Sequence, residues 1–530
     1  MTTKKSGGKS SGKSSAKKAA AKKSTSKKST SKKSTSKKAA AKKATSKKSG
    51  SKKGAGKAGV SHAASGVLVV NMIPKSLSGE DHQDSEPTVA VNPANPLQIA
   101  ASAFTPDPAG SGRAPIYVST DGGNTWTLNA IVPSTIADRS ATADITVAFG
   151  SSSNVLYAGI IRFPIVDEKT RLNILRTKNF QSTATMTVLE DRTGNGVDQP
   201  YVQAMTVASG PDKGKDRVYV GDNDFNAPDG RTATIDQSLN GGAAAATFRK
   251  VRIESRITPG QDGPTIRPAI HPDGTVYAVF HAWRSYDHAT GRGTADIVVV
   301  RDDRGGVGPN PFTDLVDPND NKAGMRVVRG AQFNFNGFLG QQRTGGDVAI
   351  AVDPANKNTV YMAYNDDQPG GIYGLHVFKS VDAGETWTAN FRTMLRDALN
   401  PGLAINSAGR VGFLYQQLTG TSTSARTWVT KFEILKPTGT PETVFELHRA
   451  PNNRPLKQFD PYLGDYAHLQ AVGRDFYGVF SGSNSPRKEN FPSGVVYQRN
   501  ANFQNGTLLD VDNVTPVNPS IDPFFFKVNG

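Results

Sequence analysis

From residue 66 onward, short apolar or alternating runs recur along the chain, separated by turns rich in Pro, Asn and Gly. Runs of about four to eight residues with this pattern are typical of β-strands. Seven such runs open similar units, at residues 87–91, 145–149, 201–205, 266–270, 348–352, 402–405 and 466–470. No long stretch shows the period of about 3.6 residues that marks an amphipathic helix. The pattern therefore predicts an all-β protein.

Each opening run is followed by a second apolar run, such as residues 360–364, and in several units by a third. The openings lie roughly 50–80 residues apart, which suits four-stranded antiparallel blades with loops of variable length. Two first turns, Val91-Asn-Pro-Ala-Asn-Pro and Val352-Asp-Pro-Ala-Asn-Lys, are nearly identical and indicate a true repeat. We therefore predict a β-propeller over residues 66–530, with seven blades favoured over six and the last blade completed by residues 66–73 or by the C-terminal end.

Two octapeptides share the pattern Ser-x-Asp-x-Gly-x-Thr-Trp. The fixed positions are Ser119, Asp121, Gly123, Thr125 and Trp126 in the first copy, and Ser380, Asp382, Gly384, Thr386 and Trp387 in the second. The Asp carboxylate can accept hydrogen bonds from the N–H groups of a tight turn, and Gly supplies the backbone freedom that the turn needs. A third, eroded copy begins at Ser238. Each octapeptide therefore predicts a stapled turn between two strands, with the Trp ring buried.

The octapeptides resemble the Asp box of the sialidase-like β-propellers, also called BNR repeats, and residues 66–530 as a whole resemble the bacterial proteins of that group. In that family the Asp box is a folding element on the face away from the active site. A sialidase also uses three arginines, a Tyr nucleophile activated by Glu, and an Asp acid/base. The family's Phe/Tyr-Arg-Ile-Pro motif has no match between residues 66 and 118, and the arginine triad is not recognisable. The resemblance therefore covers the scaffold and leaves open whether the protein is an enzyme.

In a propeller, the loops that enter the innermost strands crowd around one mouth of the central channel. The residues at those positions are Glu86, Asp144, Asp198, Arg267, Asp347, Asn400 and Asp465. Five of the seven are carboxylates, so their convergence would raise carboxylate pKa values by like-charge repulsion. Such a cluster could supply an acid/base pair or an oxygen-rich site for Ca²⁺. For any single member, capping of a turn is the simpler alternative.

The sequence suggests roles for these residues and for their neighbours. The catalytic candidates are Asp144, Asp198 and Asp465 as acid or base, and Tyr466 as nucleophile or sugar platform. The substrate-binding candidates are Glu86, Arg267, Asp347, Tyr201 and Arg284. Packing is the alternative for both tyrosines, charge balance for Arg267, and anchoring of an exposed loop for Arg284. No metal site is predicted from the eight scattered histidines, and the oxygen-rich segments 222–224 and 365–367 read as capped turns or as Ca²⁺ ligands.

Charge is divided unevenly along the chain. Residues 1–60 hold 21 of the 63 basic residues and none of the 46 acidic ones, so the remainder carries a net charge of −4. A segment of almost only Lys, Ser, Thr, Ala and Gly cannot bury apolar surface, so we expect residues 1–65 to form a disordered tail. Its composition resembles the lysine-rich tails of linker-histone-like proteins. Binding of nucleic acid or another polyanion by counterion release and service as a solubilising spacer are both open roles.

The remaining features concern the cellular location of the protein and its classes of function. It has no cysteine, and no apolar run approaches the ~20 residues that a membrane span needs. The basic segment has no apolar core typical of a secretory signal, so a cytoplasmic location is the default expectation, and we expect a monomer. Two hypotheses follow. The first is a carbohydrate-active propeller that acts as a glycoside hydrolase and needs no cofactor, and the second is a non-catalytic propeller that binds a glycan or protein partner.

Overall fold

The computed structural model describes residues 66–105, 113–133, 144–162, 170–192, 196–226, 230–258, 265–334, 347–420, 426–458 and 462–530. These residues belong to one compact unit, Val60–Gly530, and the predicted tail over residues 1–65 lies outside them. Within the described ranges the helices are two single 3-10 turns, η1 (Lys75–Leu77) and η4 (Lys488–Asn490). No helix in these ranges is long and apolar enough to cross a membrane. The predicted all-β fold is therefore confirmed.

Six four-stranded antiparallel sheets follow one another along the described part of the chain, each with its strands in sequence order. The first sheet is β2 (Thr88–Val91), β3 (Ile99–Ser102), β4 (Ala114–Ser119) and β5 (Thr127–Val132). The second is β6 (Ile145–Phe149), β7 (Leu156–Arg162), β8 (Arg171–Thr177) and β9 (Thr187–Arg192). The third is β10 (Val197–Thr206), β11 (Asp216–Asp224), β12 (Ala233–Ser238) and β13 (Arg249–Arg252).

The next three sheets have the same plan. The fourth is β14 (Ile266–Ile270), β15 (Val276–Asp287), β16 (Arg292–Asp302) and β19 (Met325–Asn334), with the small pair β17 (Val316–Asp317) and β18 (Lys322–Ala323) between its last two strands. The fifth is β20 (Val348–Asp353), β21 (Asn356–Gln368), β22 (Ile372–Ser380) and β23 (Thr388–Arg396). The sixth is β24 (Ala398–Ile405), β25 (Val411–Thr419), β26 (Thr427–Leu435) and β27 (Pro441–Pro451).

A seventh sheet joins segments from both ends of the described chain. Its order is β28 (His468–Val472), β29 (Asp475–Ser483), β34 (Ile521–Val528), β1 (Val67–Asn71) and β30 (Val496–Tyr497). A small sheet of β31 (Ala501–Asn502), β32 (Thr507–Leu509) and β33 (Pro516–Val517) precedes β34. β1 pairs antiparallel with β34, with Val69 opposite Phe526. The two segments that we offered as alternatives for completing the last sheet are therefore both part of it.

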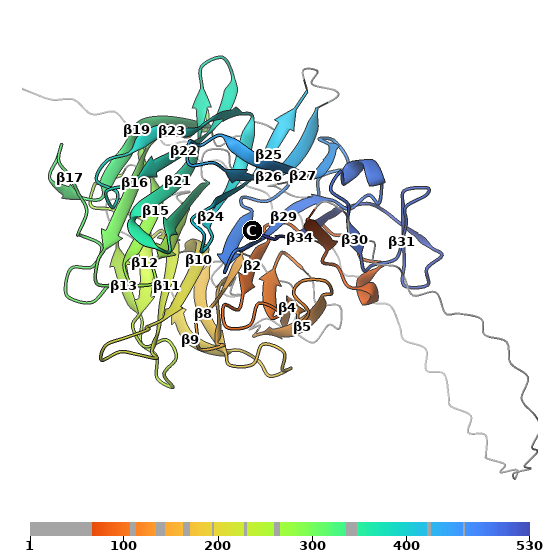
Figure 1. The fold of residues 1–530 in the computed structure, drawn as a ribbon, viewed down its shortest axis with the longest axis horizontal. Helices are drawn as coiled ribbons and strands as arrows, with labels where there is room; N and C mark the ends of the chain where they lie inside the picture. The colour runs from red at the N-terminus through yellow and green to blue at the C-terminus, as the bar shows by residue number, and fades with distance from the viewer. Residues whose placement is uncertain are drawn as a thin grey trace, which may run out of the picture. The chain divides into compact units, whose positions relative to one another are not determined.

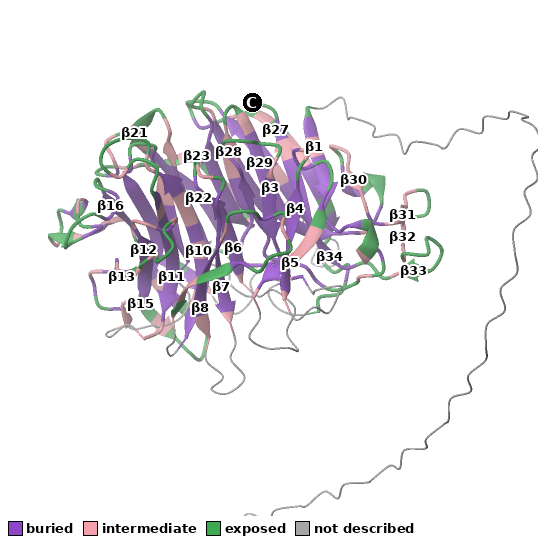
Figure 2. Ribbon diagram, turned by 90° about the horizontal axis from the view of Figure 1, so that it is seen from below, coloured by how far each residue is buried: buried purple, intermediate pink, exposed green. Residues whose placement is uncertain are grey.

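The first strands of the sheets contact one another in the order β2, β6, β10, β14, β20, β24 and β28, and β28 also contacts β2. Figure 1 shows β2, β10 and β24 toward the middle of the unit and β5, β9 and β13 at its periphery. Apolar clusters fill the spaces between neighbouring sheets, including the space between the seventh sheet and the first. The inner strands are consequently mostly buried, as the purple interior of Figure 2 shows, although β10, β14, β20 and β28 also carry residues of intermediate exposure.

The first octapeptide forms a hydrogen-bonded turn between β4 and β5. Asp121 Oδ1 accepts the Ser119 hydroxyl and the Thr125 N–H, both at 2.9 Å, and Asp121 Oδ2 accepts the Thr125 hydroxyl at 2.6 Å. The Ser119 hydroxyl accepts the N–H of Gly123 at 2.9 Å, and Trp126 Nε1 donates to the carbonyl of Gly123 at 3.0 Å. The hydrogen-bonded turn that the sequence predicts is therefore present, with each of the five fixed residues taking part.

The second octapeptide repeats this network between β22 and β23. Asp382 accepts the hydroxyls of Ser380 and Thr386 and the Thr386 N–H, and Trp387 Nε1 donates to the carbonyl of Gly384 at 2.9 Å. In both turns the glycine has φ 90°. The eroded copy, between β12 and β13, keeps only part of the network, with Asn240 Oδ1 accepting the Ser238 hydroxyl at 3.1 Å.

Candidate functional site

Three residues at the starts of first strands share an unusual backbone. Glu86, Gln199 and Asn400 have φ of 59°, 53° and 53°, and each is followed by proline. Left-handed backbone is uncommon for side chains larger than glycine, and a following proline restricts it further. Such a conformation costs about 1–3 kcal/mol and persists only where surrounding contacts hold it, most often at functional sites.

The side chains of these three residues converge on one dipeptide from the segment before β28. Glu86 Oε1 accepts the N–H of Asp465 at 3.0 Å, and Gln199 Nε2 donates to Asp465 Oδ2 at 2.9 Å. Asn400 Nδ2 donates to the carbonyl of Gly464 at 3.2 Å. We call Glu86, Gln199 and Asn400 the clamp. They come from three different parts of the chain, so the position of Asp465 depends on the first, third and sixth sheets.

Gly464 makes the close approach of the clamp possible. Its φ is 84°, and a Cβ added there would lie 2.6 Å from both the backbone nitrogen and Cγ of Glu86. No side chain can be accommodated at that distance without moving Glu86. The glycine therefore lets the chain pass directly over the first clamp residue.

Next to the clamp, Arg267 is buried between two tyrosine rings. Its Cζ lies 4.4 Å from the centroid of the Tyr201 ring and 5.2 Å from that of Tyr466, within cation–π range. Its Nη2 lies 3.7 Å from Asp347 Oδ1, which is too far for a hydrogen bond. Arg267 Nη2, Asp347 Oδ2 and the Tyr466 hydroxyl are buried, and none of them has a hydrogen-bond partner among the residues that the structure describes.

Burial governs the electrostatics of this cluster. It raises the pKa of Asp347 well above its usual range, against the opposing effect of Arg267 and together with the negative charge of Asp465. It also raises the pKa of Tyr201 to about 12. The pKa of Tyr466 is raised by burial and then by the negative charges of Glu86 and Asp144. The raised pKa favours the neutral form of Asp347, and Asp465 beside it accepts a hydrogen bond from Gln199.

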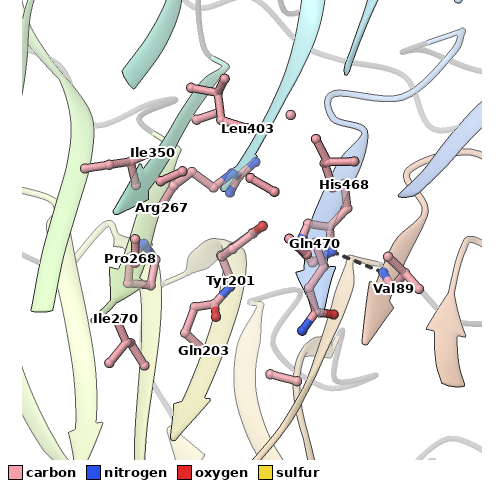
Figure 3. Close-up of a pocket in the computed structure, with 18 of the residues that line it drawn as sticks. Val89, Tyr201, Gln203, Arg267, Pro268, Ile270, Ile350, Leu403, His468 and Gln470 are labelled. Atoms are coloured by element: carbon pink, nitrogen blue, oxygen red, sulfur yellow. Dashed lines mark hydrogen bonds between the residues drawn. The ribbon is translucent and has the colours of Figure 1, made fainter. Parts of the chain in front are cut away.

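A cavity of about 230 Å³ lies in the central channel. Arg267 and Tyr201 line it, whereas Asp347 and Asp465 are not among its lining residues. The first strands line it, and its polar lining residues are Ser151, Tyr201, Gln203, Arg267, His468 and Gln470. Figure 3 shows Tyr201 and Arg267 reaching from neighbouring strands toward the side of the channel where His468 and Gln470 lie.

The structure brings most of the predicted site residues together. Glu86, Asp347, Asp465, Tyr466, Tyr201 and Arg267 form one cluster, and Asp144 lies near enough to affect Tyr466. In place of Asp198, its neighbour Gln199 contacts the cluster, and Asp198 Oδ1 accepts the Gln199 N–H at 3.0 Å. The carboxylates do not line an open mouth, because Glu86, Asp347 and Asp465 are all buried.

Arg284 lies apart from the cluster. Its Nε is 2.7 Å from Asp296 Oδ2 and its Nη2 is 3.2 Å from Glu254 Oε2, so two carboxylates already hold the guanidinium. It is also not among the residues that line the channel cavity. Arg284 is therefore placed as an ion-pair residue of the fourth sheet.

The two segments offered as Ca²⁺ ligands bind protein groups instead. Arg192 pairs with Asp222 at 2.7 Å and Asp224 at 3.3 Å. In the other segment, Asp366 Oδ1 lies 2.8 Å from His376 Nε2. Across the residues that the structure describes, no group of three or more His, Asp or Glu is arranged to hold a metal ion.

Sequence reasoning missed Gln199, Gly464 and His468. A signal for the first was present, because Glu86-Pro87, Gln199-Pro200 and Asn400-Pro401 place the same dipeptide type at three strand starts. His468 carried no comparable signal.

No known family profile matches the chain, and no curated protein matches it in sequence. Solved structures do. An ulvan lyase of polysaccharide lyase family PL25 is similar over 76% of this chain and 92% of its own, with 10% identity and a TM-score of 0.45. The GH74 xyloglucanase from Xanthomonas campestris covers 76% of this chain and 70% of its own, with 12% identity and a TM-score of 0.37. A protein of unknown function from Dyadobacter fermentans covers 88% of this chain and 100% of its own, with 13% identity and a TM-score of 0.41. At such identities and TM-scores we take neither a family nor an activity from these likenesses.

Proposed function

We propose that residues 66–530 form a closed, seven-bladed β-propeller whose two octapeptide turns are Asp boxes. The contact of β28 with β2, and the apolar cluster between their sheets, support closure after seven sheets. The matching hydrogen-bond networks at Asp121 and Asp382 support the Asp-box assignment. Because β1 lies beside β34 in the last sheet, deletion of residues 66–73 should lower the unfolding temperature by several degrees. An unchanged unfolding temperature would count against this closure.

We propose further that the protein is carbohydrate-active and hydrolyses glycosidic bonds at the Asp347–Asp465 cluster. The observation that carries this proposal is the pair of neighbouring buried carboxyl groups. Burial raises the pKa of Asp347 and favours its neutral form, and Asp465 Oδ2 accepts a hydrogen bond from Gln199 Nε2 at 2.9 Å. One proton donor and one carboxylate are the two groups that glycoside hydrolysis needs.

In this proposal Asp347 donates its proton to the glycosidic oxygen as the bond to the anomeric carbon breaks. Asp465 either takes a proton from the attacking water or attacks the anomeric carbon itself, and the released sugar is inverted or retained accordingly. Tyr201 and Tyr466 offer rings near the acid, and Arg267 holds a positive charge between them. The clamp fixes Asp465 before substrate binds, which reduces the reorganisation needed for reaction.

A turnover screen on fluorogenic glycosides, including a sialoside, tests the proposal. Asp347→Asn and Asp465→Asn should each remove turnover by at least about a hundredfold, since general acid–base groups contribute about 10²–10⁴. Asp216→Asn is a matched control, because Asp216 is buried and accepts hydrogen bonds from Tyr157 and Thr206 away from the cluster. Full activity in either cluster variant would reject the assignment.

Burial of the cluster favours a second candidate, a non-catalytic propeller that binds a glycan or protein partner. Asp347 is 6% exposed and Asp465 is 8% exposed. Such burial is equally expected of carboxyl groups that only hold neighbouring sheets together. Glycan-array binding without turnover on any glycoside would select this candidate.

For the tail we propose loose binding of nucleic acid or another polyanion. The 21 lysines of residues 1–60 have no acidic residue among them, and such segments bind by releasing counterions. DNA retention should be lost on deletion of residues 1–60 and also at raised salt. Retention that survives the deletion would assign the tail a spacer role.

A further inference from the structure

Residues 74–86, which we call the strap, lie between β1 of the seventh sheet and β2 of the first and end at the clamp residue Glu86. Arg499 binds the strap through its backbone. The Arg499 side chain has no exposed surface, and its Nη2 donates to the carbonyls of Ser78, at 2.8 Å, and of Glu80. The charges around Arg499 therefore bear on how firmly the strap is held.

Arg499 already has a carboxylate partner. Its Nη1 lies 2.9 Å from Asp522 Oδ2, and both side chains are fully buried. Asn71 Nδ2 also donates to Asp522 Oδ2 at 2.7 Å, and Asn484 Nδ2 donates to Asp522 Oδ1 at 2.6 Å. A buried ion pair is neutral overall, so little of the Arg499 charge remains to balance other carboxyl groups.

Two carboxyl groups of the strap, which we call the acid pair, are buried near this ion pair. The Glu80 side chain is 5% exposed, and its Oε2 lies 3.9 Å from Arg499 Nη1, beyond hydrogen-bond distance. Asp84 is fully buried, and neither of its carboxyl oxygens has a hydrogen-bond partner among the residues that the structure describes. Burying an ionised carboxylate without a partner is costly, so this arrangement favours neutral acids.

The electrostatics of the acid pair agree with its geometry. Burial, followed by the charge of Asp522, raises the pKa of Glu80 to about 8. Burial and the charges of Glu80 and Asp522 raise the pKa of Asp84 well above its usual range, against the opposing effects of Arg499 and the Thr105 hydroxyl. The other titratable groups that face the acid pair, the ion pair or the strap are Asp81, His82, Tyr117, Tyr497 and Asp510.

We propose that the strap is a pH-sensitive latch, held closed by protonated Glu80 and Asp84 and released as the pH rises, so that its opening withdraws Glu86 from Asp465. Glu86 Oε1 accepts the Asp465 N–H at 3.0 Å, so movement of the strap breaks this hydrogen bond of the clamp. The latch does not depend on the proposed hydrolysis, because strap opening is measured without any substrate.

The direction of the effect follows from proton linkage. The closed strap raises the pKa of Glu80 from 4.5 to about 8, so it binds a proton more tightly than the open strap does. The stabilisation that Glu80 contributes to the closed form is therefore complete below pH 4.5 and is lost as the pH rises toward 8. Asp84 acts in the same direction, because burial raises its pKa as well.

Hydrogen exchange of the full chain, followed by mass spectrometry between pH 5.5 and 8.5, tests the latch. The reporter is the Asp84 amide, whose N–H donates to the Ile521 carbonyl at 2.7 Å. After correction for the intrinsic effect of pH on exchange, Glu80 alone should lower its protection by up to about tenfold per pH unit below pH 8. The Asp465 amide should lose protection in parallel. Protection of Asp84 that stays constant, or that falls without a fall at Asp465, would overturn the proposal.

Three variants assign the effect to the acid pair. Glu80→Gln keeps the size of the side chain and removes its proton, so the total loss of protection over this pH range should shrink at least about tenfold. Asp84→Asn should also reduce the loss. Asp510→Asn is the matched control, because a Cβ at Gly79 of the strap would touch Asp510 Oδ1, yet Asp510 is only half-buried. It should keep the wild-type profile. A wild-type profile in both Glu80→Gln and Asp84→Asn, or an equally flattened one in Asp510→Asn, would overturn the assignment.

Discussion

The two octapeptide turns offer a direct test of how neighbouring packing sets the cost of one backbone position. Gly123 and Gly384 occupy the same place in each turn and both have φ 90°. A Cβ at Gly123 would lie 2.1 Å from Cε1 and 2.5 Å from Cζ of Phe525, a fully buried ring of β34. A Cβ at Gly384 would lie 3.2 Å from the nearest atom, Leu315 Cδ2. The substitution to alanine is therefore strained in both turns but sterically blocked in only one.

The two costs can be separated. Alanine in a left-handed backbone loses about 1–2 kcal/mol in either turn. At Gly123 the Phe525 ring must also move, and it packs against Trp126 with ring centroids 5.2 Å apart. Overpacking of this kind costs about 1–3 kcal/mol more. We therefore expect Gly384→Ala to lower the free energy of unfolding by about 1–2 kcal/mol and Gly123→Ala by about 2–5 kcal/mol.

Guanidinium unfolding followed by far-ultraviolet circular dichroism measures the difference, provided that the slope of the transition is unchanged. Gly409→Ala is the backbone control, because Gly409 has φ 73° and no atom within 4 Å of an added Cβ. Equal losses at Gly123 and Gly409 would refute the packing argument. No loss at Gly409 would refute the backbone argument.

Other substitutions test the clamp, the channel and the ion pairs. Gln199→Leu removes the hydrogen bond to the Asp465 carboxylate and should destabilise the fold by about 1.5–3 kcal/mol, while Gln199→Gly should lose less because glycine also relieves φ 53°. His468→Gln should flatten the loss of stability on acidification. The pKa of His468 falls from 6.5 to about 3 on folding, so its contribution is present above pH 6.5 and is lost as the pH falls toward 3. Arg192→Met leaves three buried aspartates without their cationic partner and should lower the free energy of unfolding by about 3–5 kcal/mol. Unfolding midpoints, taken as a function of pH for His468→Gln, measure all three.

Two results would contradict the predictions for Gln199 and His468. A Gln199→Gly variant less stable than Gln199→Leu would show that the left-handed backbone carries no strain. An acid profile of His468→Gln identical to the wild type would show that the imidazole does not stay neutral in the folded protein.

The sequence predicted the strands well, because each is a local pattern. The opening run at 145–149 became β6 (Ile145–Phe149), and the run at 348–352 became the start of β20 (Val348–Asp353). The octapeptides also predicted their own hydrogen bonds, since every donor and acceptor of the staple lies within eight consecutive residues.

The sequence did not predict which side chains of the inner strands reach the centre of the unit. β10 has an irregularity between Asp198 and Tyr201, and successive side chains of a strand point to opposite faces. A shift of one residue therefore exchanges the side chain that reaches the middle, where Gln199 donates a hydrogen bond to Asp465. The last opening run, predicted from residue 466, begins as a strand at His468.

By itself, the sequence determined a repeated all-β unit, its turns and the acidic character of the residues that enter the inner strands, because these depend on neighbours a few positions apart. The tertiary structure decided which of those residues meet, how deeply they are buried, and that Arg267 lies between two tyrosine rings. Burial and mutual distance set the protonation of Asp347, and both arise from strands that are far apart in the chain.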